Sequence, residues 1–211
     1  MTRLQKLLRF VKSLFPRIAE KYTRFYCRLR GLDVMSDYER DFDLASGHGY
    51  EATSVSCFRA ALRHIPVPTS EIRLLDIGCG KGSIIIYARK AGIANLGGVE
   101  LSQKFITICE QNLRILRYNN VELIQQDATT LGAVLDKYNV FYMFNPFPAS
   151  IMRPFLSKVI ESLERHFREV YIVYDNPIEA NVFDEMKFIL KHSLVVPIYH
   201  DRTINIYTWE K

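Results

Sequence analysis

Short runs of β-branched and apolar residues alternate with segments of helical periodicity from residue 72 onward. This alternation is typical of a parallel sheet that helices cover on both faces. We expect strands at about 72–77, 96–100, 121–125, 139–144 and 169–174, and helices at about 53–64, 82–91, 102–117, 150–166 and 179–191. Two final β-rich runs, 194–199 and 203–209, are joined by His200, Asp201 and Arg202, a connection that permits only antiparallel pairing. The sequence therefore predicts an α/β fold with a seven-stranded, mostly parallel sheet that closes with an antiparallel hairpin.

The composition excludes several other classes of protein. Hydrophobic residues make up 48% of the 211 residues and charged residues 24%, which excludes collagen-like and low-complexity chains. The longest apolar runs are far shorter than the roughly 20 residues that a membrane-spanning helix needs. The four cysteines form no CxxC pair, so we expect no metal site and a reducing compartment. We expect a cytoplasmic protein, and attachment to the inner membrane surface stays open.

The first 30 residues differ from the rest of the chain. They hold nine Lys or Arg residues and one acid, Glu20, although the whole chain has a net charge of only +5. Apolar residues recur at steps of three and four, which predicts an amphipathic helix. Pro16 predicts a break near Phe15, with a second helix starting at Pro16, or else a kink. We therefore divide the chain into a basic helical leader, 1–30, and a second region, 31–211.

Three uses of this leader stay open. It packs on its own domain with a solvated basic face, it adsorbs to an anionic membrane surface, or it binds nucleic acid or an acidic protein. An organellar presequence is also compatible with a start that is rich in arginine and poor in acids.

The strongest local signal is a strand that runs into a glycine-rich turn and then a helix, Leu74-Leu75-Asp76-Ile77-Gly78-Cys79-Gly80-Lys81-Gly82. Glycines let the backbone approach a ligand closely, and the start of a helix offers unpaired N–H donors. Glu100 follows Gly78 by 22 residues, at the predicted end of the second strand. An acid at that place can accept both hydroxyls of a ribose. We therefore predict a ligand site for a nucleoside at this turn.

Two more loops follow the third and fourth predicted strands. They carry Gln125-Gln126-Asp127-Ala128 and Phe144-Asn145-Pro146-Phe147-Pro148. Because the carboxyl ends of parallel strands meet at one edge of a sheet, all four strand ends should converge on one crevice.

These four motifs, in this order, resemble the class I S-adenosylmethionine-dependent methyltransferases over about residues 50–209. The resemblance implies a Rossmann-like sheet, here with an N-terminal helical extension, and S-adenosylmethionine as the cofactor. In that family the glycine turn holds the amino-acid end of the cofactor, which implies contacts from Asp76, Gly78 and Gly80. The acid after the second strand binds the ribose, which implies Glu100. The resemblance also implies that Asp127 and the backbone of Ala128 bind the adenine amine.

Asn145-Pro146-Phe147 resembles the (D/N)PP(Y/F) loop of amino methyltransferases. In that loop the Asn side chain and a proline carbonyl accept hydrogen bonds from the acceptor nitrogen, and an aromatic ring stacks on it. Phe147 stands where the second proline is expected, and Pro148 stands where the aromatic residue is expected. The resemblance implies catalytic roles for Asn145, Pro146 and Phe147, and a simple helix-initiating turn stays open as the alternative.

His48-Gly49-Tyr50-Glu51-Ala52-Thr53-Ser54 resembles the tyrosine-containing segment that many of these enzymes fold over the cofactor. Tyr50 would cover the sulfonium, and Thr53 or Ser54 would bind the carboxylate of the cofactor. Capping of the helix that follows explains Thr53 and Ser54 equally well.

The resemblance implies methyl transfer from S-adenosylmethionine to a nitrogen of a protein, a nucleic acid or a small molecule. One alternative is an O-methyltransferase that acts on a glycan or lipid-linked substrate at a membrane surface. A hydroxyl acceptor needs a base, for which Asp175, His48 and Glu51 are the candidates. A second alternative is a cofactor-binding scaffold without catalysis. A nicotinamide-dependent oxidoreductase would explain the glycine turn, but neither Asp127, Asn145 nor the final hairpin.

Overall fold

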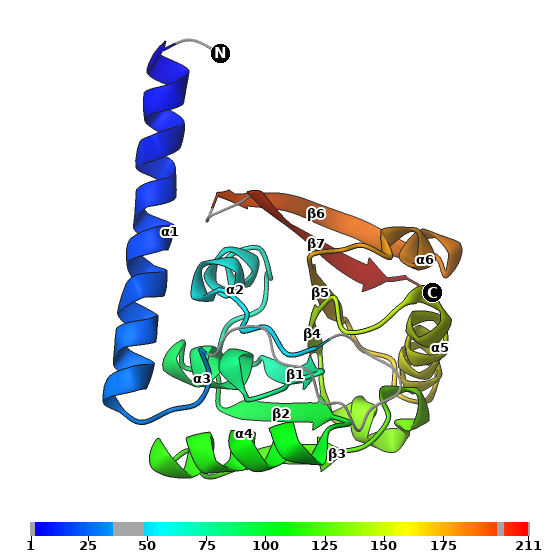
Figure 1. The fold of residues 1–211 in the computed structure, drawn as a ribbon. Helices are drawn as coiled ribbons and strands as arrows, with labels where there is room; N and C mark the ends of the chain where they lie inside the picture. Colours follow the sequence, from blue (N-terminus) through cyan, green and yellow to red (C-terminus); the bar gives the residue numbers. More distant parts are fainter. Residues whose placement is uncertain (1–2, 36–48, 198–200, 211) are drawn as a thin grey trace.

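The computed structural model describes residues 3–35, 49–197 and 201–210, with side chains described from Leu14 onward. A single seven-stranded sheet, in the order β3-β2-β1-β4-β5-β7-β6, forms the centre of the fold (Figure 1). Its strands are β1 (Arg73–Ile77), β2 (Asn95–Glu100), β3 (Val121–Gln125), β4 (Val140–Phe144), β5 (Tyr171–Asp175), β6 (Phe188–Pro197) and β7 (Asp201–Trp209). β1 to β5 pair in parallel, and β7 pairs antiparallel with both β5 and β6. The predicted α/β fold, with its Rossmann-like sheet and C-terminal hairpin, is confirmed.

The strand order reverses beside β1, because the chain adds β2 and β3 on one side of β1 and β4 and β5 on the other. Parallel pairing directs the carboxyl ends of these five strands to one edge of the sheet. Open α/β sheets bind ligands at such a reversal, outside the carboxyl ends of the strands. The loops that follow β1, β2, β3 and β4 therefore lie at the edge of the sheet where the ligand is expected.

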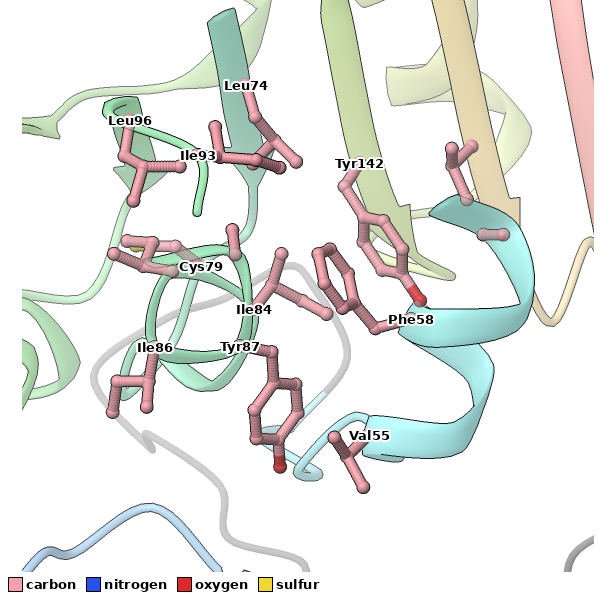
Figure 2. Close-up of a cluster of buried hydrophobic side chains, with 14 of the residues drawn as sticks. Val55, Phe58, Leu74, Cys79, Ile84, Ile86, Tyr87, Ile93, Leu96 and Tyr142 are labelled. Atoms are coloured by element: carbon pink, nitrogen blue, oxygen red, sulfur yellow. The ribbon is translucent and has the colours of Figure 1, made fainter. Parts of the chain in front are cut away.

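Helices cover both faces of the sheet, and a separate apolar cluster fills each face. One face carries α2 (Val55–Leu62), α3 (Ser83–Lys90) and α4 (Gln103–Ile115), with α1 (Arg3–Leu29) outside α2. Figure 2 shows this cluster, in which Phe58 of α2 and Ile84 of α3 meet Leu74 and Tyr142 of the sheet. The other face carries α5, α6 and two short 3-10 turns, with bounds α5 (Ala149–Arg165), α6 (Ala180–Glu185), η1 (Ala128–Thr130) and η2 (Ala133–Lys137).

α1 is one uninterrupted helix with Pro16 inside it, so the predicted break near Phe15 is wrong. The apolar periodicity continues in phase across Pro16, and a continuous helix keeps those residues on one face at the cost of one backbone hydrogen bond. α1 is also tied to α2, because Ser54 donates its hydroxyl hydrogen to the Glu20 carboxylate. The backbone N–H of Ser56 donates to the same carboxylate at 3.3 Å.

The region after β5 differs from the prediction of a helix at 179–191. α6 ends at Glu185, Lys187 adopts a left-handed φ of 61°, and β6 already begins at Phe188. β6 is an edge strand with a bulge between Leu190 and His192, and most of its first half is exposed. The bulge removes the strict alternation of buried and exposed residues by which a strand is identified in a sequence.

β7 is also longer than predicted. It begins at Asp201, so Asp201 and Arg202 pair with Pro197 and Val196 of β6 instead of forming the connection. His200, the third residue of the predicted connection, lies outside the described residues.

Candidate functional site

The glycine turn after β1 is fixed to the end of β2. The backbone N–H groups of Gly78 and Cys79 both donate to the carbonyl of Val99, at 2.8 and 2.9 Å. Gly78 and Gly80 have φ angles of 74° and 51°, which lie in the left-handed region that favours glycine. Gly78 is exposed at the edge of the sheet, so its backbone can be reached by a ligand.

Glu100 ends β2 and ties the glycine turn to the start of α4. Its Oε2 accepts the backbone N–H of Gly80 at 2.9 Å, and its Oε1 accepts the N–H groups of Leu101 and Ser102 at 2.8 and 2.9 Å. Ser102 then caps α4 by accepting the N–H of Phe105. Three charge-assisted hydrogen bonds therefore hold the carboxylate of Glu100 at the mouth of the turn.

Asp76 lies close to Glu100, one residue before the end of β1. Its side chain is buried, and burial together with the nearby charge of Glu100 raises the pKa of Asp76 well above its ordinary value. Two carboxyl groups therefore lie at the carboxyl ends of β1 and β2, where they disfavour an anion and favour donors or a cation.

The loop after β3 joins this edge through a backbone contact, because the N–H of Gln126 donates to the carbonyl of Glu100 at 3.1 Å. The Asp127 carboxylate accepts the backbone N–H and the hydroxyl of Thr129, both at 2.8 Å, and so caps η1. Asp127 is exposed and Ala128 is buried behind it. The structure thus brings Asp127 to the same edge as Glu100, where it also has a local structural role.

Tyr50 packs directly on the glycine turn. A β-carbon built on Gly80 would lie 2.3 Å from Cδ2 of the Tyr50 ring, so the ring fits only because residue 80 is a glycine. The Tyr50 hydroxyl donates to the carbonyl of Val34, and the ring centroid lies 5.5 Å from that of Phe105. Burial raises the pKa of Tyr50 well above its ordinary value, so the hydroxyl stays protonated. Tyr50 therefore covers the turn as a neutral ring.

Thr53 and Ser54 start α2. Ser54 is the N-cap, and its hydroxyl oxygen accepts the N–H groups of Ser56 and Cys57. The side chain of Thr53 is buried, and its carbonyl accepts the hydroxyl of Tyr87 at 3.3 Å. The capping alternative is confirmed for Ser54, and the role of Thr53 in cofactor binding stays a prediction.

Asn145 follows β4 in a strained conformation, with a φ of 35°. Its backbone N–H donates to the carbonyl of Asp175 at 3.1 Å, and its Oδ1 accepts the Tyr174 hydroxyl at 3.3 Å. The Tyr174 hydroxyl in turn accepts the N–H of Glu179 at 3.1 Å. Burial raises the pKa of Tyr174 to about 12, so this hydroxyl stays protonated and able to donate. Asn145 is thus held at both its backbone and its side chain.

The next two residues of this loop, Pro146 and Phe147, lie in different surroundings. Pro146 touches the glycine turn, because a β-carbon built on Gly78 would lie 3.2 Å from Cβ of Pro146. Phe147 is buried in the cluster on the α5 face, where its ring meets Phe155 edge to face at 5.8 Å. The structure therefore places Pro146 beside the glycine turn, Asn145 next to it in the chain, and the Phe147 ring in the core.

Asp175, the last residue of β5, is buried beneath α2. Tyr142 donates its hydroxyl to Oδ2 of Asp175 at 3.0 Å, and the Arg202 guanidinium lies 3.9 Å from Oδ1. Burial raises the pKa of Asp175 to about 6, against the opposing effect of Arg202 and Tyr142. Of the other two candidate bases, Glu51 is exposed and pairs with Arg202 at 3.4 Å, and His48 lies outside the described residues.

Sequence reasoning missed the ion pair of Lys81 with Asp33. The Lys81 side chain is only 1% exposed, and its Nζ lies 2.9 Å from both carboxylate oxygens of Asp33. The same ammonium lies 5.3 Å from the centroid of the Tyr50 ring. A lysine inside the glycine turn that follows an apolar strand was the available signal, because an ammonium that becomes buried needs a partner. The partner itself lies 48 residues away in the sequence and follows no pattern.

The donors and acceptors of this site indicate which ligands fit it. The N–H of Gly80 already donates to Glu100, so it is not offered to a ligand phosphate, and Asp76 adds a second carboxyl group nearby. This arrangement opposes a pyrophosphate and fits a ligand with hydroxyl, amine or cationic groups. Among the residues that the structure describes, no three His, Cys, Asp or Glu side chains are grouped so as to hold a metal ion.

Comparison with known proteins shows the family. The profile of the family described as "Methyltransferase domain" matches residues 68–193. Among named relatives, the ribosomal protein L11 methyltransferase of Dictyoglomus thermophilum is 26% identical over 134 residues, which are 63% of this chain and 40% of that protein. The same enzyme of Lactobacillus gasseri is 29% identical over 129 residues, 61% of this chain and 38% of that protein. The chain thus matches about two fifths of the length of these relatives.

A solved structure supports the fold. Magnesium protoporphyrin IX methyltransferase from Synechocystis, solved with bound S-adenosylmethionine, superimposes with a TM-score of 0.58. The two chains are 18% identical, and the match covers 92% of this chain and 97% of the other.

Proposed function

The chain belongs to the methyltransferase-domain family, and on that premise we propose that it transfers a methyl group from S-adenosylmethionine to a nitrogen acceptor. The observation that carries this proposal is the contact of Glu100 with the glycine turn. A carboxylate that already accepts the N–H of Gly80 favours a hydroxyl-bearing, phosphate-free nucleoside over a dinucleotide.

The residues of the candidate site divide between the parts of this cofactor. We assign the amino-acid end to Asp76, Gly78, Gly80 and Thr53, the ribose to Glu100, the adenine to Asp127 with the backbone of Ala128, and the cover to Tyr50. Glu100 suits a donor or a cation, a bound cation would favour ionisation of Asp76 against its raised pKa, and the neutral Tyr50 ring suits a cation beside its face. When bound, the cofactor supplies an electrophilic methyl group on a cationic sulfur.

The task that remains for the protein is to orient the acceptor. We assign this task to Asn145 and the carbonyl of Pro146, with Phe147 as the buried support of their loop. The Tyr174 hydroxyl, which donates to Oδ1 of Asn145, orients the amide so that the remaining capacity of Oδ1 can accept a hydrogen bond from the acceptor nitrogen. The protein need not form a covalent intermediate. It accelerates the transfer by holding the acceptor nitrogen in line with the carbon–sulfur bond, and such positioning supplies much of the rate of a bimolecular reaction.

The acceptor is proposed only as a class. The named relatives methylate a ribosomal protein, which supports a protein nitrogen, but this chain matches only about two fifths of their length. A nucleic acid or a small molecule with a planar or primary nitrogen fits the Asn145 loop equally well.

One observation favours a second candidate, O-methylation of a glycan or lipid-linked substrate. A hydroxyl acceptor requires a base. The pKa of Asp175 is raised to about 6, so its carboxylate would be ionised at neutral pH and able to take up a proton from the acceptor. Asp175 is joined to the Asn145 loop through its own carbonyl, which places it at the neighbouring strand end. A base role would require the residues around Asp175 to move, because this residue is only 1% exposed.

Two calorimetric titrations test the cofactor assignment. We expect S-adenosylhomocysteine to bind to the protein and NAD not to bind. NAD binding without S-adenosylhomocysteine binding would overturn the proposal. Binding of S-adenosylhomocysteine by a protein that transfers no methyl group to any component of a cell extract would favour a scaffold without catalysis.

A labelling experiment then identifies the acceptor. Cell extract, the protein and S-adenosylmethionine labelled with carbon-13 in its methyl group are incubated together, and the protein, RNA, lipid and small-molecule fractions are separated. The carbon chemical shift of the transferred methyl distinguishes N-methyl from O-methyl products. An O-methyl product that disappears in the Asp175→Asn variant would replace the first candidate by the second.

A further inference from the structure

α1 has two different faces. Its inner face contacts the body of the protein, where Glu20, Thr23 and Cys27 are buried. Its outer face exposes six large apolar side chains, which recur at helical spacing: Leu14, Phe15, Ile18, Tyr22, Phe25 and Leu29. Phe15 and Leu29 are 73% and 72% exposed. In the described part of the chain, no other helix or strand exposes more than three such side chains, so this stripe requires an explanation.

The charges beside this stripe are positive. Lys21, Arg24 and Arg28 are exposed, and helical spacing places Lys21 and Arg28 next to Phe25. Glu20 is the single acid among the first 30 residues, and its carboxylate is turned inward to Ser54 and Ser56 of α2. The outer face of α1, which we define as the six apolar residues with Lys21, Arg24 and Arg28, therefore combines apolar and cationic groups, and no acid of α1 shares it.

We propose that the outer face of α1 binds the surface of an anionic lipid bilayer, with the helix axis lying in the interface. Amphipathic helices with basic borders bind in this way, because their apolar side chains enter the acyl boundary and their cations meet the headgroups. Tyr22 is of the aromatic type that favours the membrane interface, and Phe15 and Phe25 suit the apolar face of an interfacial helix. α1 projects beyond the rest of the fold in Figure 1, so a flat surface can approach it. The described residues contain no helix whose length and hydropathy would let it span a bilayer.

Charge decides between this occupant and two others. A second copy of α1 would bring two cationic borders together, and like charges oppose such a pair. A nucleic acid would neutralise the cations but would leave the apolar stripe in water. An anionic bilayer satisfies both parts of the face. This inference does not depend on methyl transfer.

Vesicle flotation with the full chain tests the proposal. Vesicles of equal parts phosphatidylcholine and phosphatidylglycerol should carry at least about tenfold more protein than vesicles of phosphatidylcholine alone, because several cations meet the anionic headgroups. High salt should reduce the bound fraction. The double substitution Ile18→Ser with Phe25→Ser should reduce binding about tenfold or more, since both side chains would otherwise enter the bilayer.

The matched control is the double substitution Phe167→Ser with Ile178→Ser. These residues are 68% and 64% exposed, comparable to Ile18 and Phe25 at 54% and 64%, but they lie away from α1. The control should bind like the unchanged protein, and circular dichroism should show that both variants fold. Equal binding to both kinds of vesicle, or no effect of the α1 substitutions, would overturn the proposal. A dimer by light scattering that the α1 substitutions dissociate, or binding of labelled RNA in place of vesicles, would also overturn it.

Discussion

Gly80 and Tyr50 are in direct contact, so closely that a β-carbon on residue 80 would lie 2.3 Å from Cδ2 of the tyrosine ring. The backbone of the glycine turn and the segment that precedes α2 therefore fix each other's position. Neither could be replaced by a larger residue without a shift of the other.

Gly80→Ala should destabilise the protein by about 2 kcal/mol more than Gly92→Ala. Both glycines have a positive φ, 51° and 92°, so both variants strain the backbone, but Gly92 has no neighbouring atom within 4 Å of an added β-carbon. Urea denaturation measures the two free energies of unfolding. The double variant Gly80→Ala with Tyr50→Ala should lose less stability than the sum of the two single variants, because the clash is then absent. Equal destabilisation by Gly80→Ala and Gly92→Ala would show that the ring moves aside without cost.

Glu100→Gln should weaken the binding of S-adenosylhomocysteine by about 2 kcal/mol, because charge-assisted hydrogen bonds are roughly twice as strong as neutral ones. Isothermal calorimetry measures the change. Glu122→Gln is the control, since Glu122 lies on β3 and pairs with Lys137 and Tyr138 away from the glycine turn. The ribose assignment would be refuted by an unchanged affinity in a Glu100→Gln protein that remains folded.

Asn145→Ala should abolish turnover and leave cofactor affinity unchanged. Asn145→Gly accepts the φ of 35° without strain, so comparing the two variants separates the loss of the amide from the strain of the backbone. We expect both to be inactive. Methyl transfer from labelled cofactor provides the measurement, and full activity in Asn145→Gly would remove the amide from the reaction.

Tyr174→Phe should lower kcat about tenfold with little change in cofactor affinity, because it removes the hydroxyl that orients Oδ1 of Asn145. Tyr171→Phe is the matched control, since its hydroxyl donates to Glu169 at the opposite end of β5. Equal kcat values for these two tyrosine variants would mean that Asn145 needs no such partner.

Asp175 predicts a dependence of stability on pH. Its folded-state pKa of about 6 lies above the roughly 3.9 of an unfolded aspartate, so the folded state binds the proton more tightly. Its contribution to stability is full below about pH 4 and is lost as pH rises through about 6. Asp175→Asn should therefore gain about 2 kcal/mol relative to the unchanged protein between pH 4 and pH 7. Denaturation at both pH values measures the gain, which the exposed Asp184→Asn should not reproduce.

The fold was predictable because its signals are local. Each signal can be read from a short stretch of sequence. This holds for the alternation of strands and helices, for the glycine turn and for Glu100 at the end of its strand. The end of α6 was not predictable in the same way, since it depends on the left-handed φ of Lys187 and on a bulge in β6. The predicted break at Pro16 was wrong because the apolar periodicity continues on both sides of the proline, and this periodicity favours one continuous helix.

The contacts that hold the candidate site were less predictable than its residues. Tyr174 orients Asn145 from 29 residues away, Asp33 pairs with Lys81 over 48 residues, and Tyr142 reaches Asp175 over 33. Such pairs depend on which strands become neighbours, and no periodicity encodes them. The burial of Phe147 follows from the same cause, because its ring packs on Phe155 of α5 in the apolar cluster of that face.

The contact of Glu20 with the start of α2 affects how any shortened version of this protein behaves. Removal of residues 1–30 would take away a carboxylate that accepts from Ser54 and Ser56, only a few residues beyond Tyr50. Loss of a hydrogen bond typically costs about 1 kcal/mol, and here it would loosen the segment that covers the glycine turn. If a protein without residues 1–30 bound its ligand poorly, the cause would be the disturbed segment around Tyr50. Such a result would not imply that α1 touches the ligand.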